Sequence, residues 1–326
     1  MSLVADSEID CAAAVLRAGG LVAFPTETVY GLGADASSPA ALGRLFAVKG
    51  RPSDHPVIVH LRVGEDLMRW SRDIPAVAQR LADHFWPGPL TLVLCRAAGV
   101  LDAVTGAQET VGLRTPAHPI AQRLLRAFGG GIAAPSANRF GHVSPTTAQH
   151  VRDELGGAVD MVLDGGASEV GIESTIVDLS TGAPVLLRPG RIGAAEIEAV
   201  AGRPVLRATS TSPRASGTLA AHYAPKIPLV LASPARLERV VRDAAGPVAV
   251  LARHVRPADS NAALWHVAAA DALGYGHDLY AILRTFERSG CASIVVEAPP
   301  KTAEWEAVHD RLTRAAAGGG VGPDGA

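Results

Sequence analysis

Residues 131–138 read Gly-Ile-Ala-Ala-Pro-Ser-Ala-Asn, and this stretch decides the class of fold. Residues 131–134 are apolar and short, which predicts a buried strand that Pro135 ends. Ser136 and Asn138 follow at once, so polar groups stand where the strand gives way to a loop. In open α/β sheets the ligand crevice forms at such strand ends. The stretch therefore predicts a sheet protein with a polar site at its strand ends.

Apolar runs and amphipathic segments extend this pattern along the chain. Strands are predicted at 21–24, 56–61, 90–95, 110–114, 161–163, 175–179 and 185–187. Helices are predicted at 7–18, 39–48, 74–85, 120–128 and 194–200. Ser144-Pro145 predicts another helix start, with Ser as the cap and Pro at the first position. The mixture of strands and helices indicates an α/β fold.

Residues 207–228 differ in character, because Thr-Ser-Thr-Ser-Pro at 209–213 is followed by His-Tyr-Ala-Pro at 222–225. The aromatic and proline anchors predict an ordered linker. Beyond it, strands are predicted at 229–231, 248–251, 265–267 and 293–297, and helices at 235–244, 278–289 and 303–315. We therefore expect a first domain over 1–206, the linker over 207–228, a small α/β domain over 229–315, and a disordered Gly-rich tail over 316–326.

Composition narrows the classes of protein that the chain can be. Its 326 residues exceed one typical core, and the net charge of −2 provides no basic field for nucleic acid. Cys11, Cys95 and Cys291 fit no zinc or disulfide spacing, which indicates reduced thiols in a cytoplasmic protein. The first ten residues lack the apolar core of a signal peptide. No apolar run approaches the roughly 20 residues that a membrane span needs.

Lys49 stands out because the chain has only three lysines, the others being Lys226 and Lys301, among 30 basic residues. A compact ammonium at position 49 stands beside the forked guanidinium of Arg51. A point charge next to a bidentate donor suits a polyphosphate. The alternative is an ordinary pair of solvated charges.

Standard nucleotide, zinc and hydrolase motifs are absent from the sequence. Polar groups instead follow or precede the predicted strands. They are Thr26, Glu27, Thr28, Tyr30, His60, Arg114, Thr115, Ser174, Thr175 and Arg188. Each alone also fits a cap, a turn or a surface group, Glu27 fits a structural pair with an Arg, and His60 fits a satisfied core histidine. Together they predict an anion-binding pocket at the strand ends.

Eight motifs, in this order, resemble those of the YrdC-type threonylcarbamoyl-AMP synthases. They are Pro-Thr-Glu-Thr-Val-Tyr-Gly-Leu-Gly at 25–33, Lys-Gly-Arg-Pro at 49–52, Trp-Pro-Gly-Pro-Leu-Thr at 86–91, Gly-Leu-Arg-Thr-Pro at 112–116, Ala-Pro-Ser-Ala-Asn at 134–138, Ser-Pro-Thr at 144–146, Gly-Ile-Glu-Ser-Thr-Ile at 171–176 and Leu-Arg-Pro-Gly at 187–190. His-Tyr-Ala-Pro at 222–225 is similar to the linker of the longer two-domain form. The resemblance implies a YrdC-like twisted mixed sheet with helices and a strand-end crevice, followed by a small C-terminal Rossmann-like α/β domain.

The resemblance also implies a reaction in which L-threonine, bicarbonate and ATP give threonylcarbamoyl-AMP and pyrophosphate. A separate tRNA threonylcarbamoyl transferase then uses the product to modify adenosine 37, so contact with tRNA is allowed but not required. Mg²⁺ is expected with ATP, held mainly by its phosphates and by no protein metal motif. Both the carbamate and the phosphate are anionic, so a site of cations and hydroxyls suits the step.

The family pattern implies two sets of contacts. The ATP set is Lys49, Arg51, Ser53, Thr110, Ser136, Asn138, Ser144, Arg188 and Tyr223. The L-threonine set is Thr26, His60, Arg114, Ala134 through its backbone, and Ser174. Thr115 stands where many relatives have an apolar residue, and Arg-Ala-Ser-Gly-Thr at 214–218 departs from the Pro-Gly-Met type of linker.

Two other interpretations of the function of this chain remain. An RNA-binding module of the same fold without catalysis is disfavoured by the net charge and by an aromatic content of 4%. A carbamoyl-transfer domain of hydrogenase maturation belongs to longer chains with zinc-finger-like cysteines, which this chain lacks.

Overall fold

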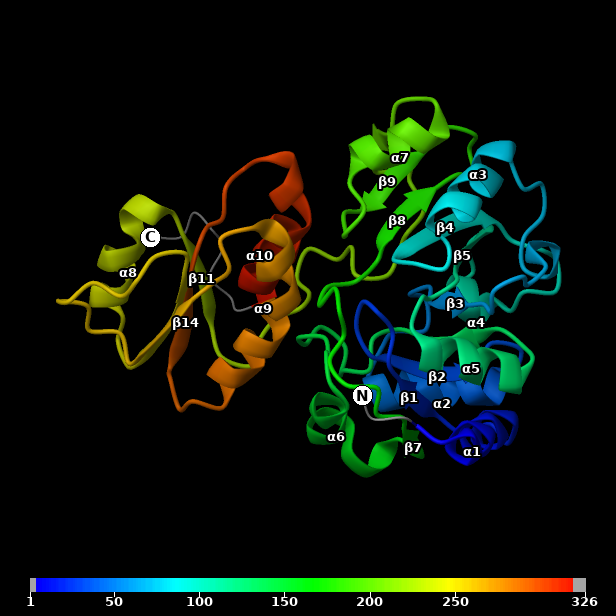
Figure 1. Ribbon diagram of the computed structural model, residues 1–326, viewed down its shortest axis with the longest axis horizontal. Helices are drawn as coiled ribbons and strands as arrows, with labels where there is room; N and C mark the ends of the chain where they lie inside the picture. Colours follow the sequence, from blue (N-terminus) through cyan, green and yellow to red (C-terminus); the bar gives the residue numbers. More distant parts are fainter. Residues whose placement is uncertain (1–3, 319–326) are drawn as a thin grey trace. The chain divides into compact units, whose positions relative to one another are not determined.

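The computed structural model describes residues 4–318, and these form two compact units (Figure 1). The first unit contains residues up to 140 together with 145–218. The second contains 141–144 and the residues from 219 onward. The predicted linker over 207–228 is therefore divided between the units at 218, and a short internal segment of the first domain is counted with the second.

The first unit is built on a ten-stranded mixed sheet with the order β10-β9-β8-β4-β5-β3-β6-β2-β1-β7. Its strands are β1 (Val22–Phe24), β2 (Gly31–Asp35), β3 (Ile58–His60), β4 (Leu90–Cys95), β5 (Thr110–Arg114), β6 (Ile132–Ala133), β7 (Met161–Val162), β8 (Thr175–Asp178), β9 (Val185–Arg188) and β10 (Leu206–Arg207). Parallel and antiparallel pairs are interspersed: β3 runs parallel to β5, and β4 runs antiparallel to β5.

Helices cover both faces of this sheet. They are α1 (Asp6–Arg17), α2 (Pro39–Lys49), α3 (Ala76–Phe85), α4 (Asp102–Thr105), α5 (Pro119–Phe128), α6 (Ala148–Leu155) and α7 (Ala194–Ala201), with the 3₁₀ turns η1 (Leu67–Arg69) and η2 (Gly156–Ala158). Successive residues of a strand point to opposite faces. Val22 and Phe24 accordingly join the apolar cluster of α1 and α5, whereas Ala23 joins that of α2 and α3.

Strand β2 was not among the predicted elements, because glycine is poor in strands and two of its five residues are glycine. Packing requires the glycine at position 33. A Cβ there would lie 2.9 Å from Phe24 Cε1 and 2.9 Å from Ile132 Cγ2. Close approach to neighbouring strands therefore overrides the local preference at this position.

The helix start predicted at Ser144-Pro145 is wrong. Helix α6 begins at Ala148, and Thr147 caps it by accepting a hydrogen bond from the backbone N–H of His150 at 3.2 Å. The carbonyl of Pro145 instead accepts a hydrogen bond at 2.9 Å from the backbone N–H of Tyr30, the residue before β2. A long-range backbone pairing thus displaces a locally favourable cap.

The second unit contains a four-stranded sheet with the order β11-β14-β12-β13, in which every pair is parallel. Its elements are β11 (Leu229–Ala232), η3 (Pro234–Arg236), α8 (Leu237–Asp243), β12 (Val248–Ala252), β13 (Leu264–Val267), α9 (Ala272–Glu287), β14 (Ser293–Glu297), η4 (Ala303–Trp305) and α10 (Glu306–Gly318). Both sheets together confirm the predicted α/β class and the Rossmann-like character of the second unit.

Helices α8, α9 and α10 all differ from their predicted bounds, and α8 covers Leu237–Asp243 instead of 235–244. Helix α9 begins six residues before position 278, because Asp271 caps it by accepting from the N–H groups of Leu273 and Gly274. Helix α10 continues to Gly318, three residues past the predicted boundary at 315. The rest of the predicted tail, 319–326, lies outside the described residues.

The second unit also contains Tyr223 and the segment 141–144, which includes Ser144. The family resemblance assigned both Ser144 and Tyr223 to ATP. The ring of Tyr223 is buried, stacks on Tyr280 at 5.9 Å, and lies 5.0 Å from the guanidinium carbon of Arg311. The internal segment 141–144 is held by Arg284, which donates to the carbonyl oxygens of Val143 and Ser144. Tyr223 adopts a left-handed φ of 60°, which costs a non-glycine residue about 1–3 kcal/mol and is sustained by this packing.

Candidate active site

The carboxyl ends of β3 and β5 bring His60 and Arg114 together. They are the last residues of two parallel strands and stand opposite each other in the register. Both are buried, with 3% and 4% of their surface exposed. Two of the predicted strand-end residues are therefore adjacent and largely shielded from water, where electrostatic interactions are stronger than in solvent.

Arg114 is fixed from two sides. Its Nε donates to the carbonyl oxygen of Gly88 at 3.2 Å, and its Nη2 lies 2.7 Å from a carboxylate oxygen of Glu27. The other Glu27 oxygen accepts from Ala117 N at 2.9 Å. The reading of Glu27 as a structural partner of an Arg is confirmed. The Nη1 group of Arg114 donates to no other described residue, so it can receive a carboxylate from a ligand.

His60 is neutral over the ordinary pH range. Burial, and then the nearby charge of Arg114, lower the pKa of His60 to about 3. Its Nδ1 atom is buried and has no hydrogen-bond partner among the described residues. Its ring meets Phe24 edge-on at 6.0 Å. The alternative of a fully satisfied core histidine therefore does not describe this side chain, and its orphaned nitrogen is a candidate contact for a ligand.

Thr26 lies in the turn after β1. Its hydroxyl contacts Val29 O at 2.6 Å and Thr28 Oγ1 at 2.8 Å, and it accepts from the N–H groups of both residues. This arrangement orders the turn as a Ser/Thr turn does. Ala134 follows β6, and its N–H donates to Ile58 O, which fixes the backbone that was assigned to L-threonine.

Arg188 and Ser174 connect the two predicted sets. Arg188, the last residue of β9, donates from Nε and Nη2 to Ser174 O at 3.1 and 2.9 Å, and from Nη2 to Ser174 Oγ at 3.1 Å. Ser174 Oγ also lies 2.8 Å from Thr91 Oγ1. Arg188, which the resemblance assigned to ATP, therefore fixes the position of Ser174, which the resemblance assigned to L-threonine.

Lys49 ends α2 and is buried, with 2% of its surface exposed. Its Nζ donates to the carbonyl oxygens of Ser136 and Asn138, so the two sequence motifs at 49 and 136 meet. Burial and the nearby charge of Arg51 hold the pKa of Lys49 well below its usual value of 10.5. The solvated-charge alternative is therefore wrong for Lys49.

Part of the linker lies against the same residues. Arg51 Nη2 donates to Pro56 O at 2.7 Å and to Ser216 Oγ at 3.4 Å, and Arg188 Nη1 donates to Ser216 O at 2.8 Å. Gln108 fixes the neighbouring Arg214 by accepting from its N–H at 2.7 Å and donating to its carbonyl at 3.1 Å. The linker segment 214–216 is therefore docked on the first unit.

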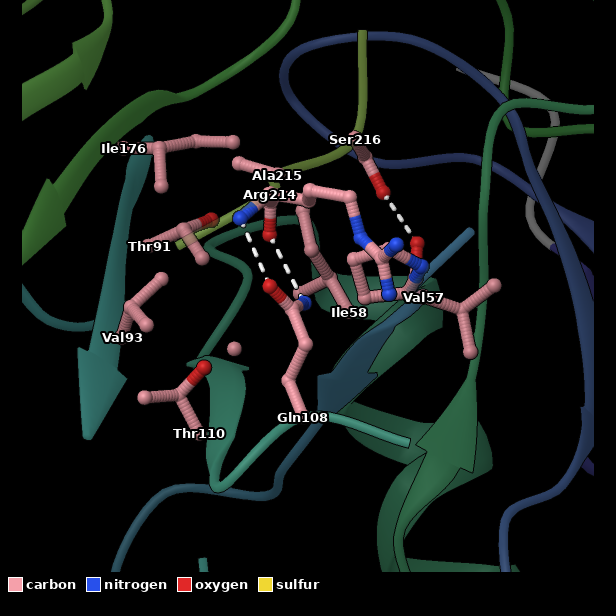
Figure 2. Close-up of a pocket in the computed structure, with 12 residues that line it drawn as sticks. Val57, Ile58, Thr91, Val93, Gln108, Thr110, Ile176, Arg214, Ala215 and Ser216 are labelled. Carbon is pink, nitrogen blue, oxygen red and sulfur yellow. Dashed lines mark hydrogen bonds between the residues drawn. The ribbon is translucent and has the colours of Figure 1, made fainter. Parts of the chain in front are cut away.

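Figure 2 shows the cavity that this segment closes. Residues of the sheet face, including Ile58, Thr91 and Thr110, form one side, and linker residues 214–216 form the other. About 20 Å³ of space remains, room for about one water molecule. The linker thus covers apolar and hydroxyl-bearing strand surface next to the cations.

The predicted ATP-binding residues are divided between the two units. Among the ATP set, Lys49 is hydrogen-bonded to Ser136 and Asn138, and Arg51 and Arg188 both donate to Ser216. Ser53 is exposed, and Thr110 lines the cavity of Figure 2. Ser144 and Tyr223 belong to the second unit.

Sequence reasoning did not assign Thr91, Gln108 or Ser216 to the site. The motif at 86–91 contains Thr91, but nothing local distinguishes its hydroxyl from that of any strand threonine. No group of three or more His, Cys, Asp or Glu side chains suited to a metal ion occurs within residues 4–318. None of the helices in that range is long and apolar enough to cross a membrane.

Comparison with known proteins identifies the family. The family model described as Telomere recombination (Sua5_yciO_yrdC) matches residues 14–190, and the one described as Threonylcarbamoyl-AMP synthase, C-terminal domain, matches 192–317. The threonylcarbamoyl-AMP synthase of Bacillus subtilis is 40% identical over 96% of this chain and 94% of its own length. That of Halorhodospira halophila is 36% identical over 56% of this chain and 90% of its own length.

A solved structure is similar to this chain over nearly its whole length. The crystal structure of P. abyssi Sua5 complexed with L-threonine matches with a TM-score of 0.90 and 36% identity, covering 98% of this chain and 96% of that one. The relatives thus include one that matches nearly the whole of this chain and a shorter one that matches 56% of it. The chain belongs to the threonylcarbamoyl-AMP synthase family, in its longer form with a YrdC-like domain and a Sua5 C-terminal domain.

Proposed function

We propose that the chain condenses L-threonine, bicarbonate and ATP into threonylcarbamoyl-AMP and pyrophosphate. Membership of the family and the match over 96% of the chain support this activity. The product then serves N6-threonylcarbamoylation of adenosine 37 in tRNA, which a separate transferase carries out in the cytoplasm. Contact with tRNA is not required for the first step.

The contact of Arg188 with Ser174 is the observation that carries the proposal. One buried guanidinium, assigned to ATP, touches a hydroxyl assigned to L-threonine at 3.1 Å. A reaction that joins an amino-acid derivative to the α-phosphorus of ATP requires both substrates within bonding distance. A site for two unrelated ligands would have no need of this shared contact.

The proposed step places charge where the buried cations lie. Bicarbonate yields carbon dioxide with loss of hydroxide, and the threonine amine attacks the carbon dioxide and releases a proton to give the carbamate. The carbamate oxygen then attacks the α-phosphorus, and pyrophosphate leaves with the electrons of the broken P–O bond. Nucleophile and phosphate are both anionic, so Lys49, Arg51 and Arg188 neutralise the charge that builds up between them. Arg114 holds the threonine carboxylate away from the reacting nitrogen through its Nη1 group.

His60 serves as a neutral hydrogen-bonding group in this scheme. A base with a pKa of about 3 removes a proton from an ammonium group very poorly. The proton of the threonine ammonium therefore goes to solvent or bicarbonate before the amine reacts. His60 contributes by satisfying a polar atom of the substrate with its orphaned Nδ1.

Mg²⁺ enters the proposal only with ATP. Residues 4–318 offer no cluster of acidic or imidazole ligands for a resident ion. Mg²⁺ readily binds phosphate oxygens and keeps several waters. The phosphates would carry the ion, and no step is assigned to a protein-held metal.

The linker acts as a lid on this site. Its residue Ser216 contacts both Arg51 and Arg188, and Ala215 lies against the apolar sheet face of Ile58 and Ile176. A covering segment excludes water from a carbamate and an acyl-adenylate, which both decompose in it. Its docked position and the small residual space support this role.

An RNA-free ATP/pyrophosphate exchange assay tests the proposal. We expect label to pass from pyrophosphate into ATP only when L-threonine and bicarbonate are both present. A binding module of the same fold without catalysis predicts no exchange under any of these conditions, and that result would refute the proposed activity.

A further inference from the structure

Thr91 is a buried hydroxyl at the centre of the site that the proposed contacts leave unused. It is the second residue of β4, which runs parallel to β8, and Ser174 immediately precedes β8. Thr91 Oγ1 lies 2.8 Å from Ser174 Oγ although the residues are 83 positions apart in sequence. The two residues are 0% and 1% exposed, so water does not compete for this contact.

The number of hydroxyl hydrogens limits which hydrogen bonds Thr91 and Ser174 can make. Arg188 can only donate, and it donates to Ser174 Oγ. The two hydroxyls carry one hydrogen each, and their mutual contact uses one of them. Neither side chain makes any other hydrogen bond to the described residues. One hydroxyl hydrogen is therefore left over for a ligand.

The charge of Arg188 makes Ser174 the stronger donor of the two hydroxyls. A hydroxyl that accepts from a cation becomes a stronger donor, because hydrogen bonds in a chain polarise one another. Ser174 is the hydroxyl that accepts from Arg188. A Ser174 hydroxyl whose hydrogen is donated to a bound substrate can only accept in its contact with Thr91, so in the liganded site Thr91 donates to Ser174 Oγ.

We infer that Thr91 is a positioning residue for the amino-acid substrate: it donates to Ser174 Oγ and so makes Ser174 a fixed donor to an oxygen of L-threonine. Thr91 itself does not touch the substrate. The inference rests on the proposed function, in which Ser174 contacts L-threonine. It adds a residue whose hydroxyl sets the affinity for the amino acid without affecting ATP.

Thr91→Val tests this, since it keeps the branched shape and removes the hydroxyl. Losing one neutral hydrogen bond should raise KM for L-threonine roughly 2- to 13-fold and leave KM for ATP unchanged. Thr91→Ser, which retains the hydroxyl, should restore the wild-type KM. In a Ser174→Ala background, Thr91→Val should add nothing, because the group through which it acts is gone.

Three kinetic results would overturn the inference. They are an unchanged KM for L-threonine in Thr91→Val, equal rises in KM for both substrates, or a full additional effect in the Ser174→Ala background. Thr91→Ala provides a second hydroxyl-free variant, and failure of both to fold while Thr91→Ser folds would make the hydroxyl purely structural and also overturn it. Failure of the proposed function itself is distinguishable, because the wild-type chain would then make no threonylcarbamoyl-AMP.

Discussion

Lys49 shows most clearly how residue chemistry determines the site. The ammonium is buried at the end of α2 and joins the carbonyls of Ser136 and Asn138. Desolvation disfavours its charge, and the phosphates of ATP would restore it. A buried cation held ready for an anion contributes to ligand binding more than to the stability of the empty protein.

Replacing Lys49 with Met should therefore raise KM for ATP or lower kcat. A charge-assisted hydrogen bond is worth about 1.5–3 kcal/mol, so kcat/KM for ATP should fall roughly 10- to 150-fold. Lys49→Arg should rescue only part of this, because the guanidinium is wider. Steady-state kinetics measure the effect, and Lys301→Met, at an exposed lysine, is the matched control. Full activity in Lys49→Met would remove the residue from the ATP site.

His60 gives a pH dependence of stability with a definite sign. Its pKa is about 3 in the folded protein against an ordinary value of 6.5. Between these values the unfolded chain binds a proton that the folded chain does not. The stabilising contribution is thus fully present above pH 6.5 and is lost as the pH falls toward 3, by up to about 1.4 kcal/mol per pH unit.

Urea unfolding between pH 7 and pH 4 measures this contribution. His60→Gln should show a shallower loss of the free energy of unfolding over that window than the wild type. His266→Gln, at an exposed position of β13, should keep the wild-type slope. Identical slopes for His60→Gln and the wild type would mean that His60 titrates normally in the folded protein.

At the scale of elements, periodicity predicted most strands and helices within a few residues, including β4, β5 and β14 at their observed bounds. The periodicity failed where contacts with residues distant in the sequence decide the local structure. Glycines are tolerated in β2 because neighbouring strands press against it, and the cap of α6 shifts because Pro145 pairs with Tyr30. Local signals cannot report such contacts.

The same limit applies to the site. Motifs singled out Lys49, Arg114 and Ser174 as candidate site residues, because charged and hydroxyl residues at the ends of predicted elements are visible in the sequence. The contacts of Thr91 with Ser174 and of Gln108 with Arg214 join residues 83 and 106 positions apart. The pairing of β4 with β8 brings the first two together, and docking of the linker on the first unit brings the second two together.

The linker segment 214–216 should respond to ligands as a single element. If it closes over the substrates, ATP with L-threonine should make residues 207–228 more resistant to limited proteolysis. Gln108→Ala removes both hydrogen bonds to Arg214 and should reduce this protection. Gln149→Ala, on the exposed face of α6, should leave it unchanged. Equal cleavage with and without saturating ligands would mean that the segment is only a tether.

At the scale of the whole molecule, the two units have separate apolar cores. The first unit has its own ten-stranded sheet and its own apolar clusters, so we expect it to fold alone. The first unit reaches residue 218, so a cut after 206 would sever β10 and discard the docked linker segment.

A fragment ending at residue 218 should therefore unfold cooperatively in urea. It should bind ATP more weakly than the full chain, because Ser144 loses its support from Arg284 and Tyr223 is absent. Isothermal titration with ATP compares the two proteins, with a fragment ending at 206 as the control that also lacks the linker contacts. Equal ATP affinity of the fragment ending at 218 and the full chain would leave the second unit without a part in nucleotide binding.

The most direct test of the account is pyrophosphate release from ATP by the full chain with each substrate omitted in turn. We predict release when L-threonine and bicarbonate are both present, and none above background when either is missing, because the carbamate forms from both before it attacks the α-phosphorus. Serine in place of threonine should react poorly rather than not at all, since one methyl group is worth only about 1–3 kcal/mol. Equal pyrophosphate release with and without L-threonine would contradict the account.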